Sequence, residues 1–196
     1  MEIDTPHGPA LAHLHPVKDA VGAMVLGHGA GGGVAARDLV RVTQVAREAH
    51  VSVALVEQPY RVAGRRSPAP AHQLDAAWTA VIGELLAGPL NGLPLIAGGR
   101  SSGARVACRT AQSTGAVGVL CLAFPLHPPG RPEKTRQAEL DGVAVPTLVV
   151  QGASDPFGQP AGSPQHRVVS VAGNHSLTSD LDGVAAAVRD WLAQLL

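Results

Sequence analysis

Short apolar runs alternate with helix-like segments along almost the whole chain, and this alternation limits the possible folds more than any other feature. The runs are rich in β-branched residues, as expected of strands buried on both faces, and they are Ala23–Leu26, Val51–Val56, Leu93–Ala97, Val117–Ala123, Thr147–Val150 and Val168–Val171. The intervening segments carry apolar residues at the helical period, most clearly in Ala35–Ala49, Gln73–Ala87, Ser102–Gln112 and Leu181–Leu196. Right-handed crossovers then place helices on both faces of a mostly parallel twisted sheet. The sequence therefore predicts an α/β fold.

The N-terminus departs from this pattern. Glu2–Thr5 and Ala10–His15 flank the turn-forming Pro6-His7-Gly8-Pro9, which predicts an antiparallel hairpin on one edge of the sheet. The 23 glycines and 16 prolines are spread between the apolar runs and are not gathered in a linker. We therefore expect residues 1–196 to form one domain with one core.

Charge and cysteine usage exclude several classes of partner. Lys plus Arg and Asp plus Glu number 15 each, so no field of one sign is available to attract nucleic acid or an anionic membrane. No basic leader or membrane-length apolar run is present, and Cys108 and Cys121 lie in apolar runs, typical of reduced thiols. We expect a cytoplasmic protein, a monomer or weak homodimer, with no nucleic-acid or membrane partner.

A nucleophile elbow follows the run Leu93–Ala97. Gly99, Ser101 and Gly103 form Gly-x-Ser-x-Gly directly before a helix-like segment, which is the context the motif requires. The serine must occupy a strained turn from strand to helix, and glycines on either side avoid collisions with the two elements. Ser102 fails the same test because Arg100 and Ala104 flank it. Ser101 is thus the candidate nucleophile.

An acid and a histidine follow two later strands. Asp155 comes after the strand ending at Val150, and His175 comes after the last strand. Asp before proline is common in turns and loop histidines are often merely solvated, but three such residues at strand ends, in the order Ser, Asp, His, match the α/β-hydrolase order. We predict that Ser101, Asp155 and His175 form a catalytic triad.

The loop after the first parallel strand can supply oxyanion donors. It contains His28-Gly29-Ala30-Gly31, similar to the His-Gly-x-Gly type. We assign the donors to the backbone N–H groups of Ser102 and Ala30, with Gly31 as the second choice for the latter. His28 is expected to shape the loop and border the substrate.

The same glycines support a rival hypothesis. Gly27-x-Gly29-x-x-Gly32 follows a strand and precedes a helix, and Glu57 ends the next strand, as in a dinucleotide-binding fingerprint. That interpretation leaves the elbow, the acid and the histidine unexplained, whereas the hydrolase interpretation also uses the glycines. We therefore expect no cofactor.

Other polar residues carry less information. His13 and His15 alternate on one strand, but no third ligand is identifiable by spacing, so no metal is expected. Arg61, with Arg65 and Arg66, and Arg100 beside the nucleophile are candidates for binding an anionic substrate group, although arginines in loops are more often solvated.

Three segments resemble the dienelactone-hydrolase-like α/β-hydrolases, namely Leu26–Gly32, Gly99–Ala107 and Val149–Gly158. Pro59–Arg66 and Phe124–Lys134 are more narrowly similar to an uncharacterised branch related to a subunit of the NSL acetyltransferase complex. The resemblance implies the α/β-hydrolase fold and a serine-hydrolase inheritance, with no substrate established for that branch. Such families often carry Met and Asp where this chain has Ser102 and Asn174.

Together these features predict a carboxylesterase-like serine hydrolase acting on a small ester or thioester through an acyl-enzyme. The short connection Phe124–Val145, with one helix candidate near Glu133–Leu140, leaves room for only a minimal cap and hence a shallow, open site. The alternative is a catalytically silent hydrolase fold used as a binding or scaffold protein.

Overall fold

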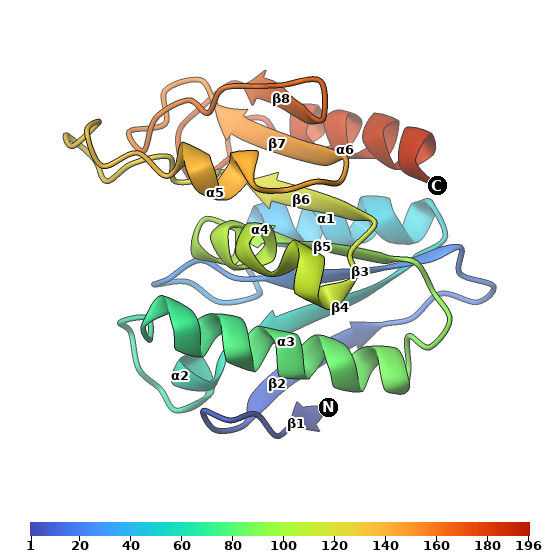
Figure 1. Ribbon diagram of the computed structural model, residues 1–196. Coiled ribbons are helices and arrows are strands. Elements are labelled where there is room, and N and C mark those ends of the chain that lie inside the picture. The colour runs from blue at the N-terminus through green and yellow to red at the C-terminus, as the bar shows by residue number, and fades with distance from the viewer.

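The computed structural model describes all 196 residues and contains one eight-stranded sheet in the order β1-β2-β4-β3-β5-β6-β7-β8 (Figure 1). The first two strands form an antiparallel pair, β2 runs antiparallel to β4, and all later neighbours are parallel. The strands are β1 (Glu2–Ile3), β2 (Ala10–His15), β3 (Gly22–Gly27), β4 (Val51–Glu57), β5 (Leu95–Arg100), β6 (Gly118–Leu122), β7 (Thr147–Gly152) and β8 (His166–Val171). The predicted mostly parallel sheet with an antiparallel N-terminal edge is confirmed.

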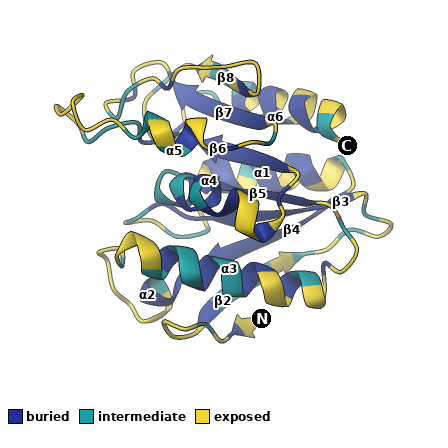
Figure 2. Cartoon of the chain, in the orientation of Figure 1, coloured by how far each residue is buried: buried dark blue, intermediate teal, exposed yellow.

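Helices cover both faces of the sheet, as Figure 1 shows. They are α1 (Arg37–Glu48), α2 (Pro59–Val62), α3 (Ala71–Ala87), α4 (Ser102–Thr114), α5 (Gln137–Asp141) and α6 (Leu181–Leu195). Side chains of the central strands alternate between two cores because successive residues of a strand point to opposite faces. In β3, for example, Met24 and Leu26 pack with α1 and α6, whereas Ala23 and Val25 pack with α3 and α4. The central strands are accordingly buried along their length (Figure 2).

The order of the strands determines where a site can form. From β3 the chain moves outward to β4 and then returns to the other side of β3 as β5. The carboxyl ends of β3 and β5 therefore lie side by side at the point where the direction of winding changes, and open α/β sheets bind ligands at this position.

Two elements differ from their predicted bounds. The fifth strand extends through Gly98, Gly99 and Arg100, beyond the predicted end at Ala97, because β6 passes so closely that a Cβ at Gly98 would lie 2.6 Å from the Leu120 carbonyl oxygen. Glycine has a low strand propensity, so the pattern ends the strand early.

The helix predicted near Glu133–Leu140 begins later, as α5, because the segment before it is held as a loop. The backbone N–H of Arg136 donates to Leu126 O at 2.7 Å and its side chain donates to Pro125 O at 2.7 Å. The connection between β6 and β7 thus contains only this short helix, so the cap is minimal. None of the helices has the length and apolar character needed to cross a membrane.

Candidate active site

Ser101 lies between β5 and α4 in a backbone conformation that L-residues rarely adopt. Its φ is 53° and its ψ is −109°, and its backbone N–H is held by the Leu122 carbonyl at 2.9 Å. Strain of this kind persists only where the surroundings impose it, and it concentrates at functional sites. The turn presents the serine above the carboxyl edge of the sheet, as the Gly-x-Ser-x-Gly motif requires.

The two flanking glycines are required by a close approach to β3. A Cβ at either Gly99 or Gly103 would lie 2.5 Å from the Gly27 carbonyl oxygen, and at Gly103 also 3.0 Å from the Gly27 Cα. These neighbours are backbone atoms that cannot rotate away. The elbow therefore brings the start of α4 directly against the end of β3.

We expect Gly103→Ala to destabilise the protein by about 3 kcal/mol or more, at the upper end of overpacking costs, because the added methyl meets rigid backbone. Alanine is the better helix former, so any loss of stability reports the collision alone. Urea unfolding measures the change. Gly32→Ala is the matched control, since no atom lies within 4 Å of its Cβ position and the change should stay within about 0.5 kcal/mol. Equal stabilities for the two variants would contradict the close approach.

The structure brings Ser101, His175 and Asp155 together in one hydrogen-bonded chain. His175, in the loop after β8, has its Nε2 2.9 Å from Ser101 Oγ and its Nδ1 2.8 Å from Asp155 Oδ2. With Nδ1 protonated and donating to the carboxylate, Nε2 is free to accept the serine proton. The Asp155 side chain is fully buried, which shields this hydrogen bond from solvent.

Two further residues orient the acid and the imidazole, and the sequence analysis missed both. Gln151, the buried residue before the end of β7, directs its Nε2 to Asp155 Oδ2 at 2.9 Å. The backbone N–H of Phe157 donates to Asp155 Oδ1 at 2.8 Å, and the Phe157 ring lies against His175 with centroids 4.2 Å apart. A glutamine directly after the apolar run Thr147–Val150 was the signal available for the first.

The loop after β3 is shaped by His28. Its Nδ1 donates to Gly29 O at 2.8 Å and its Nε2 accepts from the Gln58 backbone N–H at 3.1 Å. Burial lowers the pKa of His28, so the ring stays neutral and both nitrogens are occupied within the protein. His28 therefore fixes the conformation of the glycine loop and has no free nitrogen for proton transfer.

The candidate oxyanion donors lie on both sides of the nucleophile. The backbone N–H of Gly103 donates to His28 O at 3.1 Å, which ties the glycine loop to the start of α4, and a Cβ at Gly29 would lie 3.6 Å from Ser101 Cβ. The Tyr60 hydroxyl donates to Ala30 O at 2.8 Å and fixes the following peptide. The backbone N–H groups of Ala30, Gly31 and Ser102 have no acceptor within the protein, so they are free to bind a substrate oxygen.

The two arginines expected at the substrate have different surroundings. Burial raises the pKa of Tyr60 to about 12 against the opposing charge of Arg61, whereas burial lowers the pKa of His28 and the charge of Arg61 lowers it further. Arg61 follows Tyr60 in α2, and its Nη1 donates to Arg65 O at 3.3 Å. The guanidinium of Arg100 instead donates to Asp38 Oδ2 and to the carbonyl oxygen of His175, each at 2.8 Å. Protein acceptors thus occupy Arg100, and the expected free cation for an anionic substrate group is not found there.

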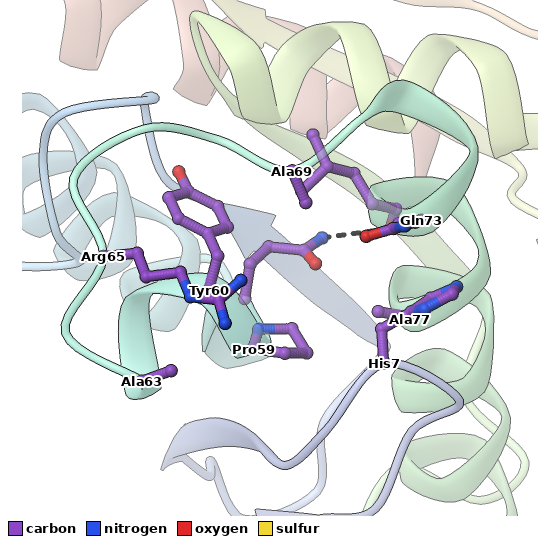
Figure 3. Close-up of a pocket in the computed structure, with 10 residues that line it drawn as sticks. His7, Pro59, Tyr60, Ala63, Arg65, Ala69, Gln73 and Ala77 are labelled. Carbon is purple, nitrogen blue, oxygen red and sulfur yellow. Dashed lines mark hydrogen bonds between the residues drawn. The ribbon is translucent and has the colours of Figure 1, made fainter.

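A cavity of about 90 Å³ lies beside Tyr60 (Figure 3). It is enclosed by α2, by the start of α3 and by the turn that carries His7. A second cavity, of about 10 Å³, touches Ser102 and Gly103 and shares Tyr60 with the first. Its volume matches about one water molecule, so no deep acyl tunnel opens beside the residue that follows the nucleophile.

The glycine run does not form a dinucleotide-binding turn in this structure. The helix that follows it begins only at Arg37, whereas the fingerprint requires its glycines to open the helix directly. Gly27 packs against Gly103, and Gly29 lies against Arg100 and Ser101. Two of the three glycines that the rival hypothesis assigned to a pyrophosphate, Gly27 and Gly29, therefore pack against the elbow. Of the two histidines that alternate on β2, His13 has its Nε2 2.7 Å from Glu57 Oε1.

Comparison with known proteins places this geometry in context. A family model described as "Alpha/beta hydrolase domain" matches residues 20–180. Similar solved structures include a lidless α/β serine hydrolase from Xanthomonas campestris, with TM-score 0.80, 19% identity and coverage of 100% of this chain and 94% of that one. Est1E from Butyrivibrio proteoclasticus, solved with ferulic acid bound, has a TM-score of 0.79 and 16% identity, with coverage of 100% of this chain and 98% of that one. A dienelactone hydrolase from Anabaena variabilis has a TM-score of 0.75 and 18% identity, with coverage of 100% of this chain and 96% of that one. No curated protein matches the sequence.

Proposed function

Because the chain belongs to the α/β-hydrolase family, we propose that it is a serine hydrolase cleaving a small carboxylic ester or thioester through Ser101, His175 and Asp155. One observation carries this proposal. A serine in the strained elbow conformation lies 2.9 Å from an imidazole whose other nitrogen lies 2.8 Å from a buried carboxylate. A catalytically silent binding protein has no need to maintain that chain of hydrogen bonds.

The reaction then follows from the positions of the protons. Ser101 Oγ attacks the carbonyl carbon while His175 Nε2 takes its proton, and Asp155 stabilises the imidazolium that results. The N–H groups of Ser102 and Ala30, or Gly31 in place of Ala30, stabilise the negative charge on the carbonyl oxygen. The leaving alcohol or thiol takes the proton from His175. In the second half of the reaction His175 removes a proton from water, the resulting hydroxide attacks the acyl-enzyme, and His175 returns the proton to Ser101 Oγ.

The shape of the site supports small substrates. Only α5 lies between β6 and β7, and the cavity beside Ser102 has about 10 Å³, so little apolar wall is available for a long acyl chain. Structural relatives include a lidless serine hydrolase and an enzyme that binds ferulic acid. We assign the border of the site to His28 and Arg61, with Arg61 the residue that an anionic substituent would meet.

We further propose that residues 1–196 act as one hydrolase domain in the reducing cytoplasm, where the free thiols of Cys108 and Cys121 are stable. Within the family, Pro59–Arg66 and Phe124–Lys134 favour the branch related to the NSL complex subunit.

Covalent labelling tests the proposal. A fluorophosphonate should phosphonylate Ser101, forming an O–P bond and releasing fluoride, and p-nitrophenyl acetate should be hydrolysed. Tryptic cleavage after Arg100 and Arg105 yields a peptide with both Ser101 and Ser102, so fragment ions must assign the label. Ser102→Ala should keep the label and Ser101→Ala should lose it. A folded protein with neither label nor turnover would establish the silent-scaffold alternative.

A further inference from the structure

Arg100 contacts three segments around the site through one side chain. It is the last residue of β5 and precedes Ser101 directly. Its Nε donates to Asp38 Oδ2 in the first turn of α1, and its Nη2 donates to the carbonyl oxygen of His175, each at 2.8 Å. A Cβ at Gly29 would lie 3.0 Å from its Nη1, so the third nitrogen passes along the glycine loop.

We propose that Arg100, anchored by Asp38, is a positioning residue that holds His175 at the correct distance from Ser101. The inference rests on the function proposed above and adds a residue that acts through the base without touching substrate. Arg100 is bonded covalently to the nucleophile residue and by hydrogen bond to the backbone of the base residue. The Arg100 side chain and backbone therefore link Ser101 to His175 directly, and this short link sets the distance between the nucleophile and the base.

The Asp38 anchor is itself rigid. Its side chain is 1% exposed, and its Oδ1 accepts the backbone N–H of Leu39 at 2.9 Å. Burial raises the pKa of Asp38, and the charge of Arg100 opposes that rise. Because a buried ion pair contributes little net stability compared with apolar packing, its value here lies in fixing the direction of the guanidinium.

The loop that carries His175 depends on this contact. Apart from the imidazole itself, the loop is tied to the neighbouring β7 loop at Gly173, whose carbonyl accepts from the Ser154 backbone N–H and hydroxyl, each at 2.9 Å. The carbonyl of His175 has Arg100 as its side-chain donor. Loss of that donor frees the backbone next to the imidazole, and misplacement of a catalytic group by about 1 Å can cost about 10²-fold in rate.

Lysine cannot replace the guanidinium in this role, because a single ammonium lacks the planar fork that reaches two acceptors in fixed directions. Arg100→Lys should therefore lower kcat for p-nitrophenyl acetate by about 10²-fold with little change in KM, and slow phosphonylation to the same extent. Added guanidinium at millimolar concentration should restore part of the kcat of Arg100→Ala, whereas a merely structural arginine would not be rescued.

Arg109→Lys is the matched control. Arg109 is 19% exposed where Arg100 is 18%. Its Nε likewise donates to an acidic side chain, but its Nη2 donates to the same residue, Asp75 on α3. We expect it to lower stability without changing kcat. Equal losses of kcat in the two lysine variants would overturn the proposal, as would an Arg100→Lys variant that changes only KM, because Arg100 would then be a substrate-binding residue.

A readout independent of turnover separates this proposal from the proposed function. The proton on His175 Nδ1, shared with Asp155, should give a downfield NMR signal in the intact protein. Arg100→Lys should shift or broaden that signal and Arg109→Lys should leave it in place. If the protein proves inert toward esters and fluorophosphonates, this difference still supports positioning by Arg100, and its absence overturns it.

Discussion

Ser101→Ala is expected to lower kcat for ester hydrolysis by about 10⁶-fold, because removing a triad serine costs about as much as removing the whole triad. The residual rate reflects the oxyanion donors and substrate binding, which are unchanged by the substitution. Alanine also fits the space of the serine, although it keeps the strained backbone with φ 53°. Steady-state kinetics with p-nitrophenyl acetate, supported by circular dichroism to confirm folding, measures the loss.

Ser102→Ala is the control for this experiment. Only the backbone N–H of Ser102 is assigned to the oxyanion, and alanine retains that group, so the loss should be far smaller than at Ser101. Comparable losses in the two variants would show that the nucleophile has been assigned wrongly.

The elbow is predictable from the sequence because its requirements are local. Gly99, Ser101 and Gly103 carry the motif, and the contacts of both glycines with Gly27 explain why no other residue fits. The fold is predictable for a similar reason, since each apolar run is long enough to reveal a buried strand. The end of β5 is not predictable in this way, because the close approach of β6 at Gly98 and of β3 at Gly99 overrides the low strand propensity of glycine.

The supporting residues of the site depend on contacts between distant segments. Arg100 and Asp38 lie on β5 and α1, and neither position shows in a single sequence that the two side chains meet. Chemistry alone made Arg100 a candidate for an anionic substrate group, and only the fold reveals its two protein acceptors. Phe157 is similar, since nothing local indicates that its ring packs on His175.

His175→Ala should lower kcat nearly as much as Ser101→Ala, and Asp155→Asn should cost about 10⁴-fold by favouring the wrong imidazole tautomer. In the unmodified protein, activity should rise with pH through one ionisation, because His175 accepts the Ser101 proton only when neutral and is inactive as imidazolium. The pH dependence of kcat/KM reports this ionisation, and His175→Ala should lose it along with the activity.

His28→Ala distinguishes the two histidines near the nucleophile. Burial lowers the pKa of His28, its Nε2 accepts the Gln58 N–H as only a neutral ring can, and its Nδ1 donates to Gly29 O. Its replacement should therefore loosen the glycine loop and lower kcat while leaving the ionisation in the pH profile unchanged. If His28→Ala instead removes the ionisation and His175→Ala retains it, the base belongs to the glycine loop and the proposed triad is wrong.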